Sequence, residues 1–294
     1  MEIFGIPIQA MMGQLLIGLI NGSFYALLSL GLAVIFGLLN IINFAHGAQY
    51  MLGAFGAYLL LNKLGLGYWW SLLVVPILVG ATGVVIERTM LKPLYKLDHL
   101  YGLLLTFGLA LIIQGLFRNE YGSTGLPYAI PEALQGGKNL GFMFLPNYRA
   151  WVIVASLVTC LSTWFVIEKT RLGGYLRAAT ENPQLVQAFG INVPRMITLT
   201  YGFGVALAAL AGVMAAPIYQ VSPQMGENLI IVVFAVVVIG GMGSIMGAIV
   251  TGFGLGLIEG LTKVFYPEAS TTVIFVIMTI VLLIRPAGLF GAQK

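Results

Sequence analysis

The chain has 294 residues, of which 59% are hydrophobic and 8% are charged, and its mean hydropathy is +0.98. Soluble domains carry roughly 25% charged residues, so this composition excludes an ordinary soluble domain and predicts a chain that resides in a lipid bilayer. The 14 Lys and Arg residues are too few for a nucleic-acid-binding face. The single cysteine, Cys160, excludes a disulfide framework, and its apolar neighbours predict a buried, inert thiol.

Long stretches without charged residues predict the membrane-spanning helices, each of which needs about 20 apolar residues. The 60 residues between Glu2 and Lys63 contain one ionisable side chain, that of His46, and leave room for two spans. Further hydrophobic segments are expected at residues 67–87, 99–117, 150–167, 196–216, 229–241, 245–265 and 270–284. The predicted fold is therefore all-α: a single transmembrane domain over residues 1–294, built as a polytopic bundle of about 8–9 hydrophobic segments.

The distribution of basic residues predicts the orientation. If residues 88–98, residues 168–195 and the C-terminal tail lie on the same side of the membrane, that side holds nine of the 14 basic residues. The opposite side then holds five. The positive-inside rule then places the N-terminus outside and the C-terminus in the cytoplasm.

Polar residues interrupt the first hydrophobic region at NIINFAHGAQY. Asn40, Asn43, His46 and Gln49 recur every three residues beside Gly47, which on one helix would keep them on a slowly drifting face. Polar groups at membrane depth are costly and usually face a bundle interior or a watery cavity. A substrate pathway and a set of interhelical hydrogen bonds are both consistent with this pattern.

A second interruption, VVVIGGMGSIMG, overlaps the end of the short segment 229–241. We expect this segment to be a half-helix. Transporters often build their sites from paired broken or re-entrant helices. The exposed ends of two such helices offer unpaired N–H and C=O groups, which suit the carboxylate and ammonium of a zwitterion.

Small residues elsewhere are interpreted as packing positions. Gly252, Gly256 and Gly260 form one stripe of a predicted helix, and residues 202–216 carry a second set of glycines and alanines. Within the same span as the first stripe, Glu259 is placed to form an i, i+4 ion pair with Lys263. A proton or ion relay through Glu259 remains an alternative to this structural role.

Two loops are long enough to have functions of their own. The predicted outer loop, residues 118–149, contains five glycines and three prolines and is either a docking surface for a soluble partner or a connector.

The predicted cytoplasmic loop, residues 168–196, contains a two-turn helix near residues 184–189. Asn182 is its N-cap, Pro183 occupies its first position and Gly190 ends it. Leu185, Val186 and Phe189 are expected to form an apolar ridge that packs on the bundle or on a cytoplasmic partner. The flanks supply the charged residues Arg177, Glu181 and Arg195.

Catalytic and nucleotide-binding motifs are missing. The only Gly-Lys pair, Gly137-Lys138, is followed by Asn139, and Glu132 stands where a nucleotide-binding loop has its first glycine. The sequence lacks HExxH and GxSxG motifs for hydrolysis. We therefore expect no enzymatic activity and no bound cofactor, with any ATP bound by partner chains.

The sequence resembles the membrane permease subunits of branched-chain amino acid ABC importers, the LivH-type family. The resemblance covers nearly the whole chain, and its most specific blocks are NFAHG, TRLGGYLRAATENPQLVQAFGIN, VVVIGGMGSIMG and RPAGLFG.

The resemblance implies a second homologous permease, two cytoplasmic ATPase subunits and a periplasmic amino-acid-binding protein, in the plasma or inner membrane of a bacterium or archaeon. It makes residues Glu181 to Gly190 a coupling helix that sits on the ATPase, and the outer loop a contact for the binding protein. It also places two groups of residues near the translocation path. The first group is Asn43, His46 and Gly47, and the second is Gly240, Gly241, Gly243 and Ser244. Asn40 and Gln49, which belong to the same polar set as the first group, are expected beside it. Many relatives have an acidic or hydroxyl residue after NFAHG, where this chain has Ala48.

Two kinds of alternative remain for function. Relatives of this kind also carry urea, short amides or other amino acids. A secondary carrier would instead use Glu259 or His46 for proton coupling and would work without partners.

Overall fold

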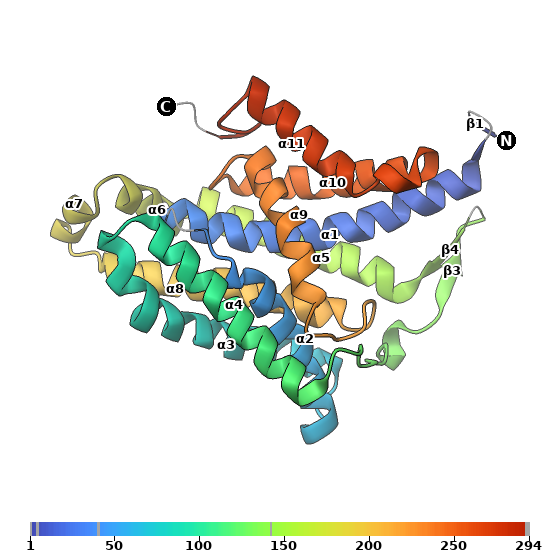
Figure 1. Cartoon of the computed structure of the whole chain (residues 1–294), viewed down its shortest axis with the longest axis horizontal. Coiled ribbons are helices and arrows are strands. Elements are labelled where there is room, and N and C mark those ends of the chain that lie inside the picture. Colours follow the sequence, from blue (N-terminus) through green and yellow to red (C-terminus); the bar gives the residue numbers. More distant parts are fainter. Residues whose placement is uncertain (1, 4–5, 40–41, 142, 292–294) are drawn as a thin grey trace.

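The computed structural model describes residues 2–3, 6–39, 42–141 and 143–291, and this part is built almost entirely from α-helices (Figure 1). In chain order the α-helices are α1 (Ile8–Leu39), α2 (Ala45–Leu64), α3 (Tyr68–Ile86), α4 (His99–Tyr121), α5 (Asn147–Lys169), α6 (Arg171–Glu181), α7 (Pro183–Ala188), α8 (Val193–Ala215), α9 (Met225–Gly240), α10 (Ile245–Phe265) and α11 (Thr272–Ile284). A π-helical turn (Glu87–Leu91) and a 3-10 turn (Lys92–Lys96) extend α3, and two further 3-10 turns lie at Glu132–Leu134 and Pro267–Ala269.

Strands are confined to two small hairpins. β1 (Glu2–Ile3) pairs with β2 (Ile6–Pro7), and β3 (Gly137–Asn139) pairs antiparallel with β4 (Phe144–Pro146), with Lys138 opposite Leu145. The β3–β4 hairpin lies at one end of the bundle, and α6 and α7 lie at the other (Figure 1). We call these the hairpin end and the α7 end.

The helices confirm the all-α, polytopic fold. Each of the nine predicted hydrophobic segments is a helix, and the chain is a multi-pass membrane protein. Within the described residues, six helical spans are long and apolar enough to cross a membrane: Ile8–Gly37, Tyr68–Lys96, His99–Tyr121, Asn147–Lys169, Val193–Ala215 and Ile245–Phe265. The helices α9 and α11 have 16 and 13 residues and are shorter than a full crossing of about 20.

Burial separates central from peripheral helices. In α1, 83% of the most apolar stretch is buried inside the protein, whereas in α4 the corresponding share is 17%. Apolar side chains exposed on α3, α4 and α5 suit contact with lipid, because lipid tails solvate them as well as a protein core does. Cys160 of α5 is fully buried, as its neighbours predicted.

Glycines bring α1 and α10 into close contact, which confirms the packing role of the predicted stripe. A Cβ atom added to Gly260 would lie 2.5 Å from the carbonyl oxygen of Gln14, and one added to Gly252 would lie 2.5 Å from Cα of Ala26. The backbones of Gly18 and Gly256 also meet without room for a side chain. Small residues thus allow the central helix to pack backbone against backbone.

One detail of the prediction was wrong, and one helix was not predicted. The four polar residues of the first interruption do not share a helix, because α2 begins only at Ala45. Asn43 precedes it and accepts a hydrogen bond from the Ala45 backbone N–H at 3.1 Å, a local bond that competes with helix formation. Asn40 lies outside the described residues. In the predicted cytoplasmic loop, Arg177 and Glu181 flank the short helix as expected, and they belong to an additional helix, α6, which the sequence did not predict.

Candidate functional site

The polar residues of the first interruption bond mainly to one another and to α1. Asn43 donates from Nδ2 to Oε1 of Gln49 at 3.2 Å, and His46 Nε2 lies 3.0 Å from the carbonyl oxygen of Leu28. All three side chains are fully buried. Next to them, Gly47 packs against the backbone of Gly226 at the start of α9. In this structure the group is a buried polar cluster at the junction of α1, α2 and α9, and His46 Nδ1 and Gln49 Nε2 have no hydrogen-bond partner among the described residues.

The second interruption is held by the C-terminal segment. Gly241 and Gly243 have positive φ angles of 101° and 84°, a conformation that glycine adopts readily. The backbone N–H of Leu289 donates to the carbonyl oxygen of Ile239 at 2.8 Å, and that of Phe290 donates to Gly240 at 3.1 Å. The RPAGLFG block therefore completes the end of α9, which would otherwise present unpaired carbonyls.

Ser244 starts the helix that follows. Its Oγ accepts a hydrogen bond from the Gly247 backbone N–H at 3.1 Å and so caps α10. Beside it, Gly243 lies against Gly37 in the last part of α1, where an added Cβ would be 3.1 Å from Cα of Gly37. The two predicted groups of path residues thus occupy two separate contacts of α1 and α9.

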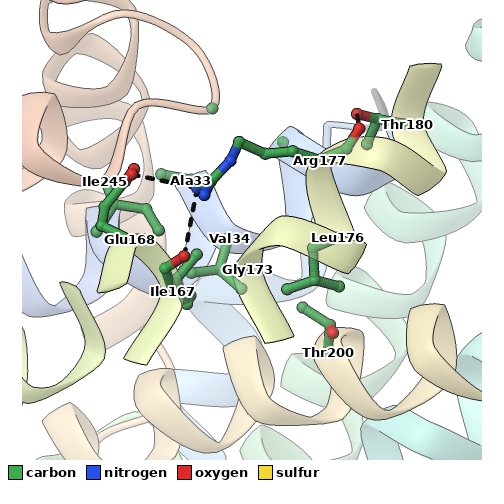
Figure 2. Close-up of a pocket in the computed structure, with 12 residues that line it drawn as sticks. Ala33, Val34, Ile167, Glu168, Gly173, Leu176, Arg177, Thr180, Thr200 and Ile245 are labelled. Atoms are coloured by element: carbon green, nitrogen blue, oxygen red, sulfur yellow. Dashed lines mark hydrogen bonds and ion pairs between the residues drawn. The ribbon is translucent and has the colours of Figure 1, made fainter. Parts of the chain in front are cut away.

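A small cavity of about 100 Å³ lies where α5, α6 and α1 meet (Figure 2). Arg177 extends across it, and its guanidinium donates to the Glu168 carboxylate at 3.1 Å and to the Ile167 carbonyl oxygen at 3.3 Å. Gly243 lines the same cavity. The structure therefore brings a residue of the predicted coupling loop and a residue of the second interruption to one place. We call this the α1–α6 cavity.

The short helix α7 has the predicted start and stop. Oδ1 of Asn182 accepts a hydrogen bond from the Leu185 backbone N–H at 3.0 Å, and Gly190 has φ of +82°. The expected single ridge is split, however. Val186 is buried against Ala179 and Val193, whereas Leu185 and Phe189 are exposed, Phe189 by 77%.

The split has a physical reason. A helix of six residues presents opposite sides to the bundle and to solvent, so one residue of the set anchors it and two remain free. Val186 therefore takes the bundle-packing role that the sequence left open, and Leu185 and Phe189 stay exposed. Glu181, the last residue of α6, is exposed beside it.

A second, larger cavity, which the sequence did not predict, lies between α1 and α9. It has a volume of about 370 Å³ and adjoins the turn between α8 and α9. We call it the α1–α9 cavity; it is lined by Asn21, Phe24, Tyr25, Tyr50, Tyr219, Gln220, Ser222, Met225, Asn228 and Leu229.

A buried carboxylate organises one wall of this cavity. Glu259 is 3% exposed; it accepts hydrogen bonds from Tyr25 at 2.7 Å and from Lys263 at 2.6 Å, which confirms the predicted ion pair. Asn21 Nδ2 lies 3.4 Å from the same carboxylate, and its Oδ1 accepts from Tyr219 at 2.8 Å.

The sequence held one signal for this wall, the charge of Glu259 inside a span. Its partners Asn21 and Tyr25 could not be identified from spacing, because they lie more than 200 residues earlier in the chain.

Comparison with known proteins identifies the family. The family model described as "Branched-chain amino acid transport system / permease component" matches residues 14–283. The chain is 30% identical to the high-affinity branched-chain amino acid transport system permease protein LivH of Escherichia coli and 31% identical to BraD of Pseudomonas aeruginosa, covering 96% of both chains in each case.

It is also 29% identical to the Escherichia coli permease protein LivM over 92% of this chain and 68% of that protein. No solved structure matches. The chain therefore belongs to the family of permease components of branched-chain amino acid transport systems.

Proposed function

We propose that this chain forms the translocation path of an ATP-driven importer for leucine, isoleucine and valine, and that its energy comes from separate ATPase subunits. The observation that carries the proposal is the family match over residues 14–283, together with relatives of nearly equal length that are named as high-affinity branched-chain amino acid permeases. The missing nucleotide-binding loop is consistent with ATP hydrolysis by partner chains.

The proposed assembly contains a second permease, two ATPases and a soluble binding protein. Similarity to both LivH and LivM, named as permease proteins of the same kind of system, supports a pair of permeases. The excess of basic residues supports a cytoplasmic α7 end and an outer hairpin end in the inner membrane. In this arrangement the exposed Leu185 of α7 and Phe189, which directly follows α7, contact an ATPase, and the loop around the β3–β4 hairpin meets the binding protein.

The proposed path runs along α1 and α9, past Asn43, His46, Gly47 and Gln49 and past Gly240, Gly241, Gly243 and Ser244. Alternating access follows if movement of α6 and α7 is transmitted through the α1–α6 cavity to the second interruption. Arg177 and Gly243 line the same cavity, which supports this route of transmission.

Reconstitution by subtraction tests the proposal. The chain is placed in liposomes with its candidate sister permease, the ATPases and the binding protein, and each component is omitted in turn while uptake of radiolabelled leucine is followed. Uptake that needs every component and ATP is expected. Uptake by this chain alone would overturn the proposal.

A further inference from the structure

The α1–α9 cavity has the form of a ligand site rather than of a packing defect. Its volume of about 370 Å³ lies within the roughly 300–1,000 Å³ of typical small-molecule sites. The lining residues range from exposed to buried: Gln220 and Asn228 are exposed, whereas Phe24, Tyr25 and Tyr50 are buried. A solute therefore has a mouth to enter and a floor to reach.

One buried polar group at the floor has no partner. Tyr50 lines the cavity and is fully buried, and its hydroxyl has no hydrogen bond within the described part of the chain. Leaving such a group unpaired costs free energy, on the order of 1–3 kcal/mol, unless something binds it. The other two phenols of this lining are already bonded, Tyr25 to Glu259 and Tyr219 to Asn21. The hydroxyl of Tyr50 is thus the one phenol among the described lining residues that has a hydrogen bond left to offer.

The lining suits a molecule with no net charge. Among the described lining residues none is charged, and the polar ones are hydroxyls and amides that both donate and accept. The first turn of α9 borders the cavity with Met225 and Asn228, and its positive end favours a carboxylate. Phe24, Met225 and Leu229 form an apolar wall.

We propose that the α1–α9 cavity binds a zwitterionic amino acid with an apolar side chain as it enters the permease. The inference rests on the proposed transport function and adds the site and its chemistry. The carboxylate accepts from the Tyr50 hydroxyl near the start of α9, the ammonium donates to the side-chain oxygens of Asn21, Ser222 and Asn228, and the side chain lies against Phe24, Met225 and Leu229. Glu259 does not touch the ligand; it is a positioning residue that fixes Tyr25 and Asn21.

Thiol protection tests the site without ATP or uptake. Ser222 lines the cavity, whereas Ser123 is exposed in the loop 122–146 and does not. Ser222→Cys and the matched control Ser123→Cys are each labelled with a small methanethiosulfonate in the permease assembled with its partner membrane and ATPase subunits in nanodiscs. The native Cys160 is buried and stays unlabelled. Millimolar leucine is expected to slow labelling of Ser222→Cys at least about threefold and to leave Ser123→Cys unchanged.

Analogues and a conservative variant test the chemistry. Leucinamide, which lacks the carboxylate, and 4-methylvalerate, which lacks the ammonium, are expected to give no protection. Tyr50→Phe in the Ser222→Cys background should raise the half-protecting leucine concentration about tenfold, because one hydrogen bond to a carboxylate is lost. Tyr128→Phe, another buried tyrosine that does not line the cavity, should leave that concentration unchanged.

The outcomes separate the site from the transport mechanism. Protection of neither cysteine, equal protection of both, or protection by leucinamide would overturn the proposed site. Loss of ATP-driven uptake in the reconstituted system with intact protection would instead overturn the proposed energy source and leave the site standing. Uptake without protection would overturn the proposed site and leave the proposed energy source standing.

Discussion

The guanidinium of Arg177 in α6 lies 3.1 Å from the carboxylate of Glu168 in the last turn of α5. This ion pair joins the proposed coupling loop to a membrane-spanning helix across the α1–α6 cavity, which Gly243 also lines (Figure 2). Both side chains are about half exposed, so the pair contributes little to stability, roughly 0–1 kcal/mol. Its main effect is expected on the transmission of movement.

Charge reversal tests this role. Arg177→Glu should lower leucine uptake per ATP hydrolysed by about tenfold while changing the free energy of unfolding by less than about 1 kcal/mol. The double variant Arg177→Glu with Glu168→Arg should recover most of the uptake, because the pair is restored with its charges exchanged. Wild-type coupling in the single variant, or no recovery in the double variant, would show that the pair is only a surface contact.

Gly190→Val tests the stop of α7. Gly190 has φ of +82°, where a β-branched residue is strained by roughly 1–3 kcal/mol, and a Cβ there would meet no atom within 4 Å. Assembly should survive, but α7 should shift and ATP hydrolysis should no longer be matched by uptake. The control is Gly174→Val in α6, which also has open space and lacks the positive φ. Equal coupling ratios in the two variants would argue against a precise position for α7.

Gly241→Leu tests the second interruption. Its effect has two sources, a blocked path and a displaced C-terminal segment. A Cβ at Gly241 would lie 2.5 Å from the backbone N of Gly291, so a leucine would displace the segment that pairs with the end of α9. We expect a loss of about 1–3 kcal/mol in stability together with reduced uptake, measured by thermal unfolding in detergent and by transport. Gly254→Leu, where no atom lies within 4 Å, should leave stability nearly unchanged. A Gly241→Leu protein of wild-type stability would contradict this packing.

Glu259→Gln separates positioning from proton relay. The amide retains an acceptor for Tyr25 but removes the charge opposite Lys263, so Tyr25 and Asn21 are held less firmly. The KM for leucine should rise about threefold, whereas the maximal rate and the requirement for ATP should not change. A proton relay would instead show abolished uptake in this variant and wild-type uptake that is sensitive to a protonophore.

The sequence predicted what depends on local pattern. Charge-free stretches located all nine hydrophobic helices, the i, i+4 spacing located the Glu259–Lys263 pair, and Asn182 with Gly190 located the ends of α7. Each of these features is set by neighbours within a few residues along the chain.

Features that depend on distant contacts were not predicted. The α1–α9 cavity needs Asn21 and Tyr219 side by side, and they are 198 residues apart. The pairing of the C-terminal segment with Ile239 and Gly240 is a backbone contact with no residue signature. The division of the α7 residues into buried Val186 and exposed Phe189 depends on where α6 and α8 pack, which helical periodicity alone does not give.

The most direct test of the account is accumulation of leucine against its gradient in proteoliposomes that contain the complete proposed assembly. With ATP on the ATPase side and a protonophore present, internal leucine should rise well above the external concentration, and without ATP it should not exceed it. Accumulation that persists without ATP and collapses with the protonophore would contradict the account.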